Sequence, residues 1–403
     1  MWSNPGQAQQ RWKRGRCRLA WGSGWNGLAA LVTLLPPLLV GLLAVSGARA
    51  QMTTEDRVEL PGWWPTQGRY RRTDFVGPDV CATCHPAEAD LQKTTPMAQS
   101  GGPAEGSNIL RQHNLLTVKL GDYTYTISRQ DERSLYTVIG GNETFSQPLQ
   151  WAMGLGVLGQ TFVYERQGVF FAGRVSFFSS IDRLDLTPGQ HTAHSDSPAG
   201  ARGRPLSETE ARQCFGCHTT AAVTENRLDP SQLIPGVTCE ACHGPGAKHV
   251  AAVKSGKDAQ GTIFNPITLK PVDSVDFCGA CHRAWWDVKM SNVMDEENVR
   301  FQPYRLMESR CWNPQDARIE CLACHDPHEP LVTDLSSYDS KCLACHATSA
   351  SAPRSAEKRG PACPVKSEDC VSCHMPGVVP PGLHFTFRDH HIRIPRPGGG
   401  YPA

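Results

Sequence analysis

The stretch VTCEACHGPGAKH, residues 237–249, has two cysteines three positions apart, a histidine directly after the second, and another histidine six positions later. C-x-x-C-H is the attachment signature of c-type haem. Thiols one short turn apart can form thioethers with both vinyl groups of a porphyrin, and the adjacent imidazole can bind the iron. We therefore predict that Cys239 and Cys242 hold a haem with His243 as proximal ligand. For a single copy, a zinc ribbon, an iron–sulfur site or a disulfide would remain open.

The same five-residue motif occurs seven times and uses fourteen of the seventeen cysteines. A zinc site needs C-x-x-C units in pairs and no histidine after each one, whereas all seven copies carry it. The repetition favours seven covalently attached haems c. The predicted attachment cysteines are Cys81, Cys84, Cys214, Cys217, Cys239, Cys242, Cys278, Cys281, Cys321, Cys324, Cys342, Cys345, Cys370 and Cys373. The predicted proximal ligands are His85, His218, His243, His282, His325, His346 and His374, and we number the motifs 1–7 in this order.

The first fifty residues have the pattern of a signal peptide. Basic residues at 11–18 precede an apolar run over about 28–45, and Ala48-Arg49-Ala50 is a small-x-small cleavage site. An uncleaved membrane anchor is the alternative, but the run is near the lower length limit for a span and contains Pro36-Pro37. Because haem is attached to such cysteines outside the cytoplasm, we expect a bacterial periplasmic or cell-surface protein without a membrane span in the mature chain.

The charge balance argues against a nucleic-acid partner. The chain has 40 Lys and Arg against 39 Asp and Glu, and six of the basic residues lie in the first fifty positions, which hold no acidic residue. The mature chain therefore carries a formal charge of −5. Nucleic-acid binding proteins present a basic face instead.

The spacing of the motifs predicts the organisation of the chain. Motifs 2–7 begin at intervals of only 25, 39, 43, 21 and 28 residues, too little chain for an ordinary core, so haems must supply much of the buried apolar surface. We predict a multihaem cytochrome c fold of short helices and loops around stacked haems, with a small antiparallel β insert. The expected parts are a signal peptide (1–50), a first haem segment (51–107), a β-rich insert (108–182) and a six-haem core with a C-terminal ligand tail (183–403).

The 133 residues between the first two motifs contain period-two patterns. LLTVKL-GD-YTYTISR predicts a hairpin with Tyr123, Tyr125 and Ile127 on one face, and QTFVYER-QG-VFFAGRVSFF predicts a second one. GLGVLG at 154–159 matches the glycine pattern of a dinucleotide site, but it leads into a strand pattern and not a helix. We expect these glycines to form a tight turn between strands.

Eight further histidines could supply sixth ligands to iron. A second histidine suits electron transfer, whereas an open position allows substrate chemistry. We expect His249 to cap a neighbouring haem, and His328, His384 and His390 to be ligands as well. His113 and Met97 are further candidates, and His191, His194 and His391 are held in reserve.

Several stretches together resemble a known superfamily. CEACHGPGAKH, CHDPH and CVSCHMP followed by FTFRDHHIRI are similar to the multihaem cytochromes that include hydroxylamine oxidoreductase, ammonia-forming nitrite reductase, tetrathionate-reducing octahaem cytochromes and the tetrahaem partner of hydroxylamine oxidoreductase. GLGVLGQTFVYE and EARQCFGCHTT indicate a branch with a β insert after the first haem. The resemblance covers most of 78–395 and implies parallel and perpendicular haem pairs. It also implies distal ligation by His249, His328, His384 and His390. Two features differ: the chain has no C-x-x-C-K motif, and none of its eight tyrosines is singled out for a covalent haem link.

The leading hypothesis is an exported heptahaem cytochrome that transfers electrons between redox partners of a respiratory chain, such as a quinol-side donor and a terminal reductase. In this interpretation the histidines and cysteines bind cofactors and no residue is catalytic. The alternative is an oxidoreductase acting on a small nitrogen or sulfur compound at one five-coordinate haem. The sequence is compatible with an oligomer. Cys311 and Cys363, the unpaired mature cysteines, could form a disulfide or remain free thiols.

Overall fold

The structure is a computed structural model that describes residues 70–190, 195, 197–225, 227–291, 296–346 and 361–394. The expected signal peptide, Cys17, His191 and His194 lie outside the described residues. Within the described part of the chain, no helix has the length and apolar character needed to cross a membrane.

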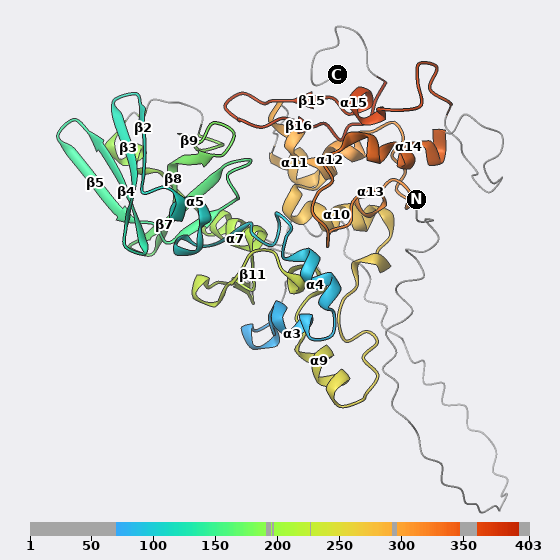
Figure 1. The fold of residues 1–403 in the computed structure, drawn as a ribbon. Coiled ribbons are helices and arrows are strands. Elements are labelled where there is room, and N and C mark those ends of the chain that lie inside the picture. The colour runs from blue at the N-terminus through green and yellow to red at the C-terminus, as the bar shows by residue number, and fades with distance from the viewer. Residues whose placement is uncertain are drawn as a thin grey trace, which may run out of the picture. The chain divides into compact units, whose positions relative to one another are not determined.

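The region after the first motif forms two antiparallel sheets (Figure 1). The first has the order β2-β3-β4-β5 and contains β2 (Leu115–Leu120), β3 (Tyr123–Gln130), β4 (Arg133–Gly140) and β5 (Glu143–Pro148). The second has the order β1-β6-β7-β8-β10, with β9 also pairing β8. Its strands are β1 (Gly101–Pro103), β6 (Trp151–Met153), β7 (Gln160–Arg166), β8 (Val169–Phe178), β9 (Arg183–Leu186) and β10 (Arg204–Pro205).

Both predicted hairpins are confirmed: β2 pairs β3 and β7 pairs β8. The period-two pattern buries one face, since Tyr125 and Ile127 are fully buried and Tyr123 packs against the same cluster. Aromatic rings of the two sheets contact each other; Tyr136 of β4 lies against Tyr164 of β7 with ring centroids 6.1 Å apart. The region therefore has a hydrophobic core of its own.

The glycine pattern at 154–159 forms the expected turn. It connects β6 to β7, and Gly154, Gly156 and Gly159 all have positive φ angles, of 93°, 82° and 113°. A side chain at Gly154 would meet the carbonyl oxygen of Gly159 at 2.3 Å. These glycines therefore serve the tight turn, and no helix follows them.

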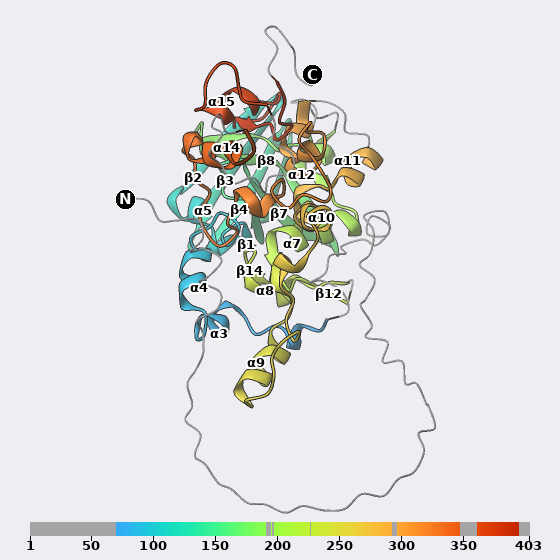
Figure 2. The same cartoon turned by 90° about the vertical axis from the view of Figure 1, so that its right-hand side faces the viewer.

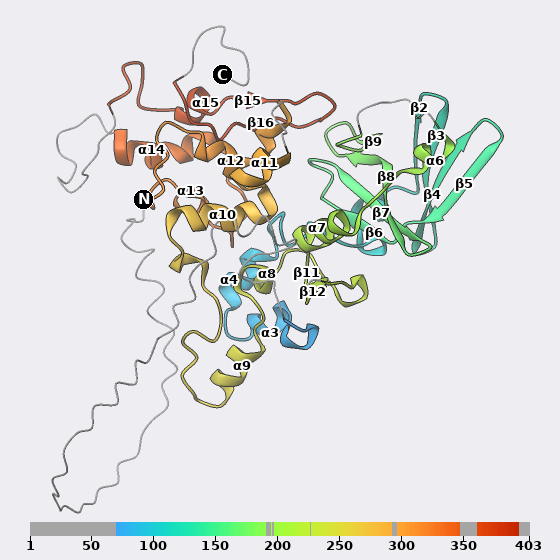
Figure 3. The ribbon, with the colours of Figure 1, turned by 180° about the vertical axis from the view of Figure 1, so that it is seen from behind.

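The rest of the described chain consists of short helices and loops. Figures 2 and 3 show the helical segments from two further directions. The helices are α3 (Pro78–Ala82), α4 (Pro86–Gln92), α5 (Asn108–Gln112), α6 (Pro198–Arg202), α7 (Glu208–His218), α8 (Cys239–His243), α9 (Ala247–Lys254), α10 (Pro271–His282), α11 (Trp285–Ser291), α12 (Gln302–Met307), α13 (Cys321–Cys324), α14 (Asp339–His346) and α15 (Cys370–His374). Small two-stranded pairings join β11 (Thr219–Thr220) to β14 (Ile234–Pro235), β12 (Val223–Thr224) to β13 (Arg227–Leu228), and β15 (Gly377–Val378) to β16 (Phe387–Arg388).

Buried hydrophobic side chains are distributed unevenly along the chain. The main cluster runs from Ala104 to Ala201, and two smaller ones add residues up to Ala222. From residue 239 onwards fewer of the described hydrophobic side chains are buried, and several of these, such as Val275, Val288 and Tyr304, lie on α10, α11 and α12. This region holds five of the seven motifs, so fewer hydrophobic side chains are buried where the sequence predicts the most haems.

Candidate haem sites

Each motif lies on or beside a short helix. Motif 1 begins in α3 and ends at the residue before α4, motif 5 begins α13, and the others end or make up α7, α8, α10, α14 and α15. On a helix, residues three and four positions apart lie on the same face. Both thiols and the following imidazole of a motif are therefore presented together, as attachment of one porphyrin requires.

Four motif imidazoles are held by main-chain carbonyl groups. Nδ1 lies near the carbonyl oxygens of Ser100 for His218 (3.0 Å), Phe264 for His243 (3.0 Å), Pro361 for His346 (2.8 Å) and Arg393 for His374 (2.8 Å). A carbonyl oxygen only accepts, so Nδ1 carries the proton and donates it. The lone pair is then on Nε2, which is the arrangement typical of metal-bound histidine.

Burial keeps several of these rings neutral. It lowers the pKa of His218, His243, His282 and His325, because a charged imidazolium is poorly solvated there. A histidine must be neutral to bind a metal. The protonation state that burial favours is therefore the one a haem ligand needs.

Two motif imidazoles face a second imidazole. The ring centroids of His243 and His328 are 6.0 Å apart with planes 15° apart, and those of His325 and His390 are 6.3 Å apart with planes at 42°. Two nitrogen–metal bonds of about 2 Å each, together with the part of each ring between nitrogen and centroid, add up to this separation. The residues present therefore fit an iron held between two imidazoles.

Both facing rings are fixed through Nδ1. Nδ1 of His328 lies 3.1 Å from Oδ1 of Asp326, which also accepts the backbone N–H of His328. Nδ1 of His390 lies 2.9 Å from the carbonyl oxygen of Arg388, and burial lowers the pKa of His390 to about 4. In both cases the acceptor at Nδ1 leaves Nε2 as the nitrogen with a lone pair.

The other histidines singled out by sequence have different surroundings. His249 in α9 is half-buried, with Nδ1 3.2 Å from Oγ1 of Thr262. His384 places Nε2 2.8 Å from Oδ2 of Asp185 on β9 and packs its ring edge-on against Phe178. Among the described residues, no second imidazole ring lies opposite either of them in the way found for His243 and His325.

Three more sequence candidates are also placed. His113 follows α5, with Nδ1 2.8 Å from the carbonyl oxygen of Ile109 and Nε2 3.3 Å from Asp182. His391 accepts a hydrogen bond at Nδ1 from the guanidinium of Arg305. Met97 lies in the turn after α4, where its carbonyl oxygen accepts the N–H of Val237.

Cysteines of different motifs lie next to one another. Thiols of four motif pairs are close enough to shift each other's pKa: Cys81–Cys239 of motifs 1 and 3, Cys217–Cys281 of 2 and 4, Cys278–Cys321 of 4 and 5, and Cys342–Cys370 of 6 and 7. The helices concerned contact each other in the same four pairs, α3 with α8, α7 with α10, α10 with α13 and α14 with α15. Figures 1 and 3 both show α14 beside α15.

Two weaker contacts connect these pairs. Cys242 of motif 3 is near enough to Cys278 of motif 4 for their charges to interact, and Cys324 of motif 5 is as near to Cys342 of motif 6. These two longer-range interactions extend the four contacting pairs to the order 1-3-4-5-6-7, with motif 2 beside motif 4. Their order in space differs from their order along the chain.

The two remaining described cysteines are unpaired. Cys311 is half-buried near Cys324 and Cys345, and burial raises its pKa, whereas Cys363 is exposed. The structure contains no disulfide between them.

Sequence reasoning missed the groups that orient the imidazoles. The carbonyl oxygens of Ser100, Phe264, Pro361 and Arg393 leave no trace in the sequence, because every residue has one. Asp326 was recognisable in principle, since an aspartate two positions before a residue often accepts its N–H.

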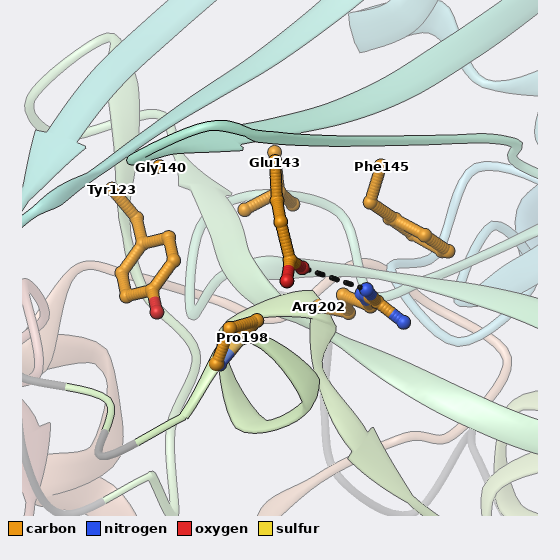
Figure 4. Close-up of a pocket in the computed structure, with 7 residues that line it drawn as sticks. Tyr123, Gly140, Glu143, Phe145, Pro198 and Arg202 are labelled. Carbon is orange, nitrogen blue, oxygen red and sulfur yellow. Dashed lines mark hydrogen bonds and ion pairs between the residues drawn. The ribbon is translucent and has the colours of Figure 1, made fainter.

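A shallow pocket lies in the β-rich region (Figure 4). Its lining includes Tyr123, Phe145 and Pro198, and an ion pair between Arg202 and Glu143, 3.2 Å long, crosses it. The cavity volume is about 10 Å³, roughly the space that one water molecule needs. The pocket therefore offers little room for a substrate.

Comparisons with known proteins agree with the motifs. A family model described as "Cytochrome c554 and c-prime" matches residues 185–244. The multiheme cytochrome MtrA of Shewanella baltica (strain OS185) is 28% identical over 206 residues, which cover 47% of this chain and 59% of that protein. The chain thus matches little more than half of that relative's length. The outer cell wall cytochrome OcwA gives a TM-score of 0.28 at 18% identity, over 52% of this chain and 37% of OcwA, which is too low to describe the fold.

Proposed function

Because the chain is a multihaem c-type cytochrome, we propose that it holds seven covalent haems and transfers electrons between redox partners. Bound haem iron would supply one-electron oxidation and reduction. The observation that carries the proposal is that motifs distant in the chain lie beside one another in space. The helix of each motif contacts the helix of at least one other motif.

The proposed ligand sets also suit electron transfer. His328 would be the sixth ligand opposite His243, and His390 the one opposite His325, as their ring separations support. With two histidine ligands a bound haem would have no position open to a substrate, and it would avoid the rise in potential that a methionine ligand causes. His249, whose Nδ1 contacts Thr262 while Nε2 remains available, stays a proposed ligand, as does His384 on the basis of the sequence.

The proposed order has three ends, at motifs 1, 2 and 7. Motif 4 joins the branch of motif 2 to the longer series. We propose that a donor protein and an acceptor protein exchange electrons at two of these ends. The export pattern at 1–50 supports a site of action in the periplasm or at the cell surface.

Matured protein should carry seven haems and take up seven electrons. The difference between the intact mass of the protein and the mass of the mature chain without haem gives the number of haems. A reductive titration followed by reoxidation gives the number of electrons. We expect seven haem increments and seven reversible one-electron steps. Six or fewer increments in fully matured protein, or fewer electrons than haems, would refute the proposal.

A further inference from the structure

A buried ion pair ties the C-terminal segment to helix α12. Nε and Nη2 of Arg305 donate to the two carboxylate oxygens of Asp389, at 2.8 and 2.9 Å. The side chain of Arg305 is 5% exposed and that of Asp389 is not exposed at all. Two parallel hydrogen bonds of this kind fix both the distance and the orientation of the partners.

The Asp389 carboxylate also organises its own segment. It accepts the backbone N–H of His391 at 3.0 Å and a hydrogen bond from the guanidinium of Arg393. The backbone N–H of Asp389 donates to the carbonyl oxygen of Pro376, directly after motif 7. One carboxylate therefore joins α12, the end of the chain and the neighbourhood of motif 7.

This arrangement places His390, which follows Asp389 in the chain. Its carbonyl oxygen accepts a hydrogen bond from Oγ of Ser309 at 2.9 Å, and the same oxygen atom of Ser309 accepts the N–H of Ile392. The backbone is thus held on both sides of His390, and the ring faces that of His325 of motif 5. With a free backbone here, the ring could turn to solvent.

The same segment reaches motif 7. The carbonyl oxygen of Arg393 lies 2.8 Å from Nδ1 of His374, and the N–H of Arg393 donates to the carbonyl oxygen of His374. The side chain of Arg393 is hydrogen-bonded to Asp389. Displacing the Asp389 carboxylate would therefore also release the carbonyl oxygen of Arg393 that orients His374. Hydrogen bonds thus connect the surroundings of both His390 and His374 to one carboxylate.

We propose that Arg305 and Asp389 are a positioning pair that holds His390 opposite His325 and sets the orientation of His374. The inference rests on the proposed haem ligation by His325 and His390. Neither residue touches the iron; the pair acts through the backbone of 388–393.

The test compares Asp389→Asn, Arg305→Lys and His390→Ala in matured full-length protein, with Asp316→Asn as the matched control. In the Asp389→Asn variant, the side-chain amide would present N–H donors to the guanidinium. The Arg305→Lys variant would keep the positive charge but lose the planar guanidinium that makes two parallel hydrogen bonds. Asp316 also forms a two-bond pair with an arginine, Arg318, but that pair is largely exposed. Intact mass verifies seven haems, electron paramagnetic resonance counts high-spin haems, and a potentiometric titration follows the midpoint potentials.

We expect His390→Ala and Asp389→Asn to produce the same additional high-spin haem, one of seven, with a partial conversion in Arg305→Lys. In Asp389→Asn a second haem, that of motif 7, should also shift in potential, which His390→Ala should not cause. Asp316→Asn should match the wild type. If His390→Ala converts a haem and both pair variants leave all haems low-spin, the positioning role is wrong while the ligation stands. If His390→Ala changes nothing, the ligation is wrong and the inference falls with it.

Discussion

A haem-free chain is expected to keep its β sheets folded and to lose the structure of residues 239–394. The sheets enclose fifteen clustered buried residues, among them Tyr125, Tyr136 and Tyr164, and each large apolar side chain so buried contributes about 1.5–3 kcal/mol. The motif helices beyond 239 have 4 to 12 residues, and the described part of this region buries far fewer hydrophobic side chains than the sheets do. Helices of that length are marginal in water by themselves.

To test this, residues 52–403 are expressed in a reducing cytoplasm, where no haem is attached, and amide hydrogen exchange is measured. Hydrogen exchange should show slow exchange in β2–β8 and unprotected amides in α8, α10 and α13–α15. Matured protein is the control, and there both regions should be protected. Protected amides in α10 and α14 of the haem-free chain would show that side chains alone hold this region, contrary to the account.

Replacing His328 or His390 with alanine should convert one low-spin haem to high-spin in each case, and the double variant should convert two. The facing rings stand at the separation that an iron between them requires, and alanine cannot replace the lost nitrogen. Each converted haem should bind carbon monoxide when reduced. Electron paramagnetic resonance of the oxidised protein counts the high-spin haems, and difference spectra of the reduced protein measure carbon monoxide binding.

Two further variants sharpen this test. Asp326→Asn keeps His328 but weakens the acceptor at its Nδ1, so the haem should stay low-spin and rise in potential, since the ligand becomes less basic. In His113→Ala the spin state should not change, because Asp182 and the carbonyl oxygen of Ile109 occupy the ring nitrogens. An unchanged spectrum in both His328→Ala and His390→Ala would contradict the proposed ligand sets.

Local chemistry explains what could be predicted from sequence. Each haem motif is made of five consecutive residues. The two confirmed hairpins and the turn at 154–159 also depend only on residues within about twenty positions of each other. The division of the β region into two sheets was not predicted, because the short strands β1, β6 and β10 carry no periodic signal. The partner of each candidate ligand was not predictable either. His328 is 85 positions from His243, and Asp389 is 84 from Arg305. Only the tertiary fold brings such residues together.

The seven haem sites should form one connected series with motif 4 as its junction. An experimental structure of the matured protein, with the seven iron positions measured, is the decisive test. Neighbouring irons are expected in the order 1-3-4-5-6-7, with the iron of motif 2 beside that of motif 4, so that motif 4 has three neighbours. An iron of motif 4 at an end of the series, or a layer of protein separating any two haems of this order, would contradict this arrangement.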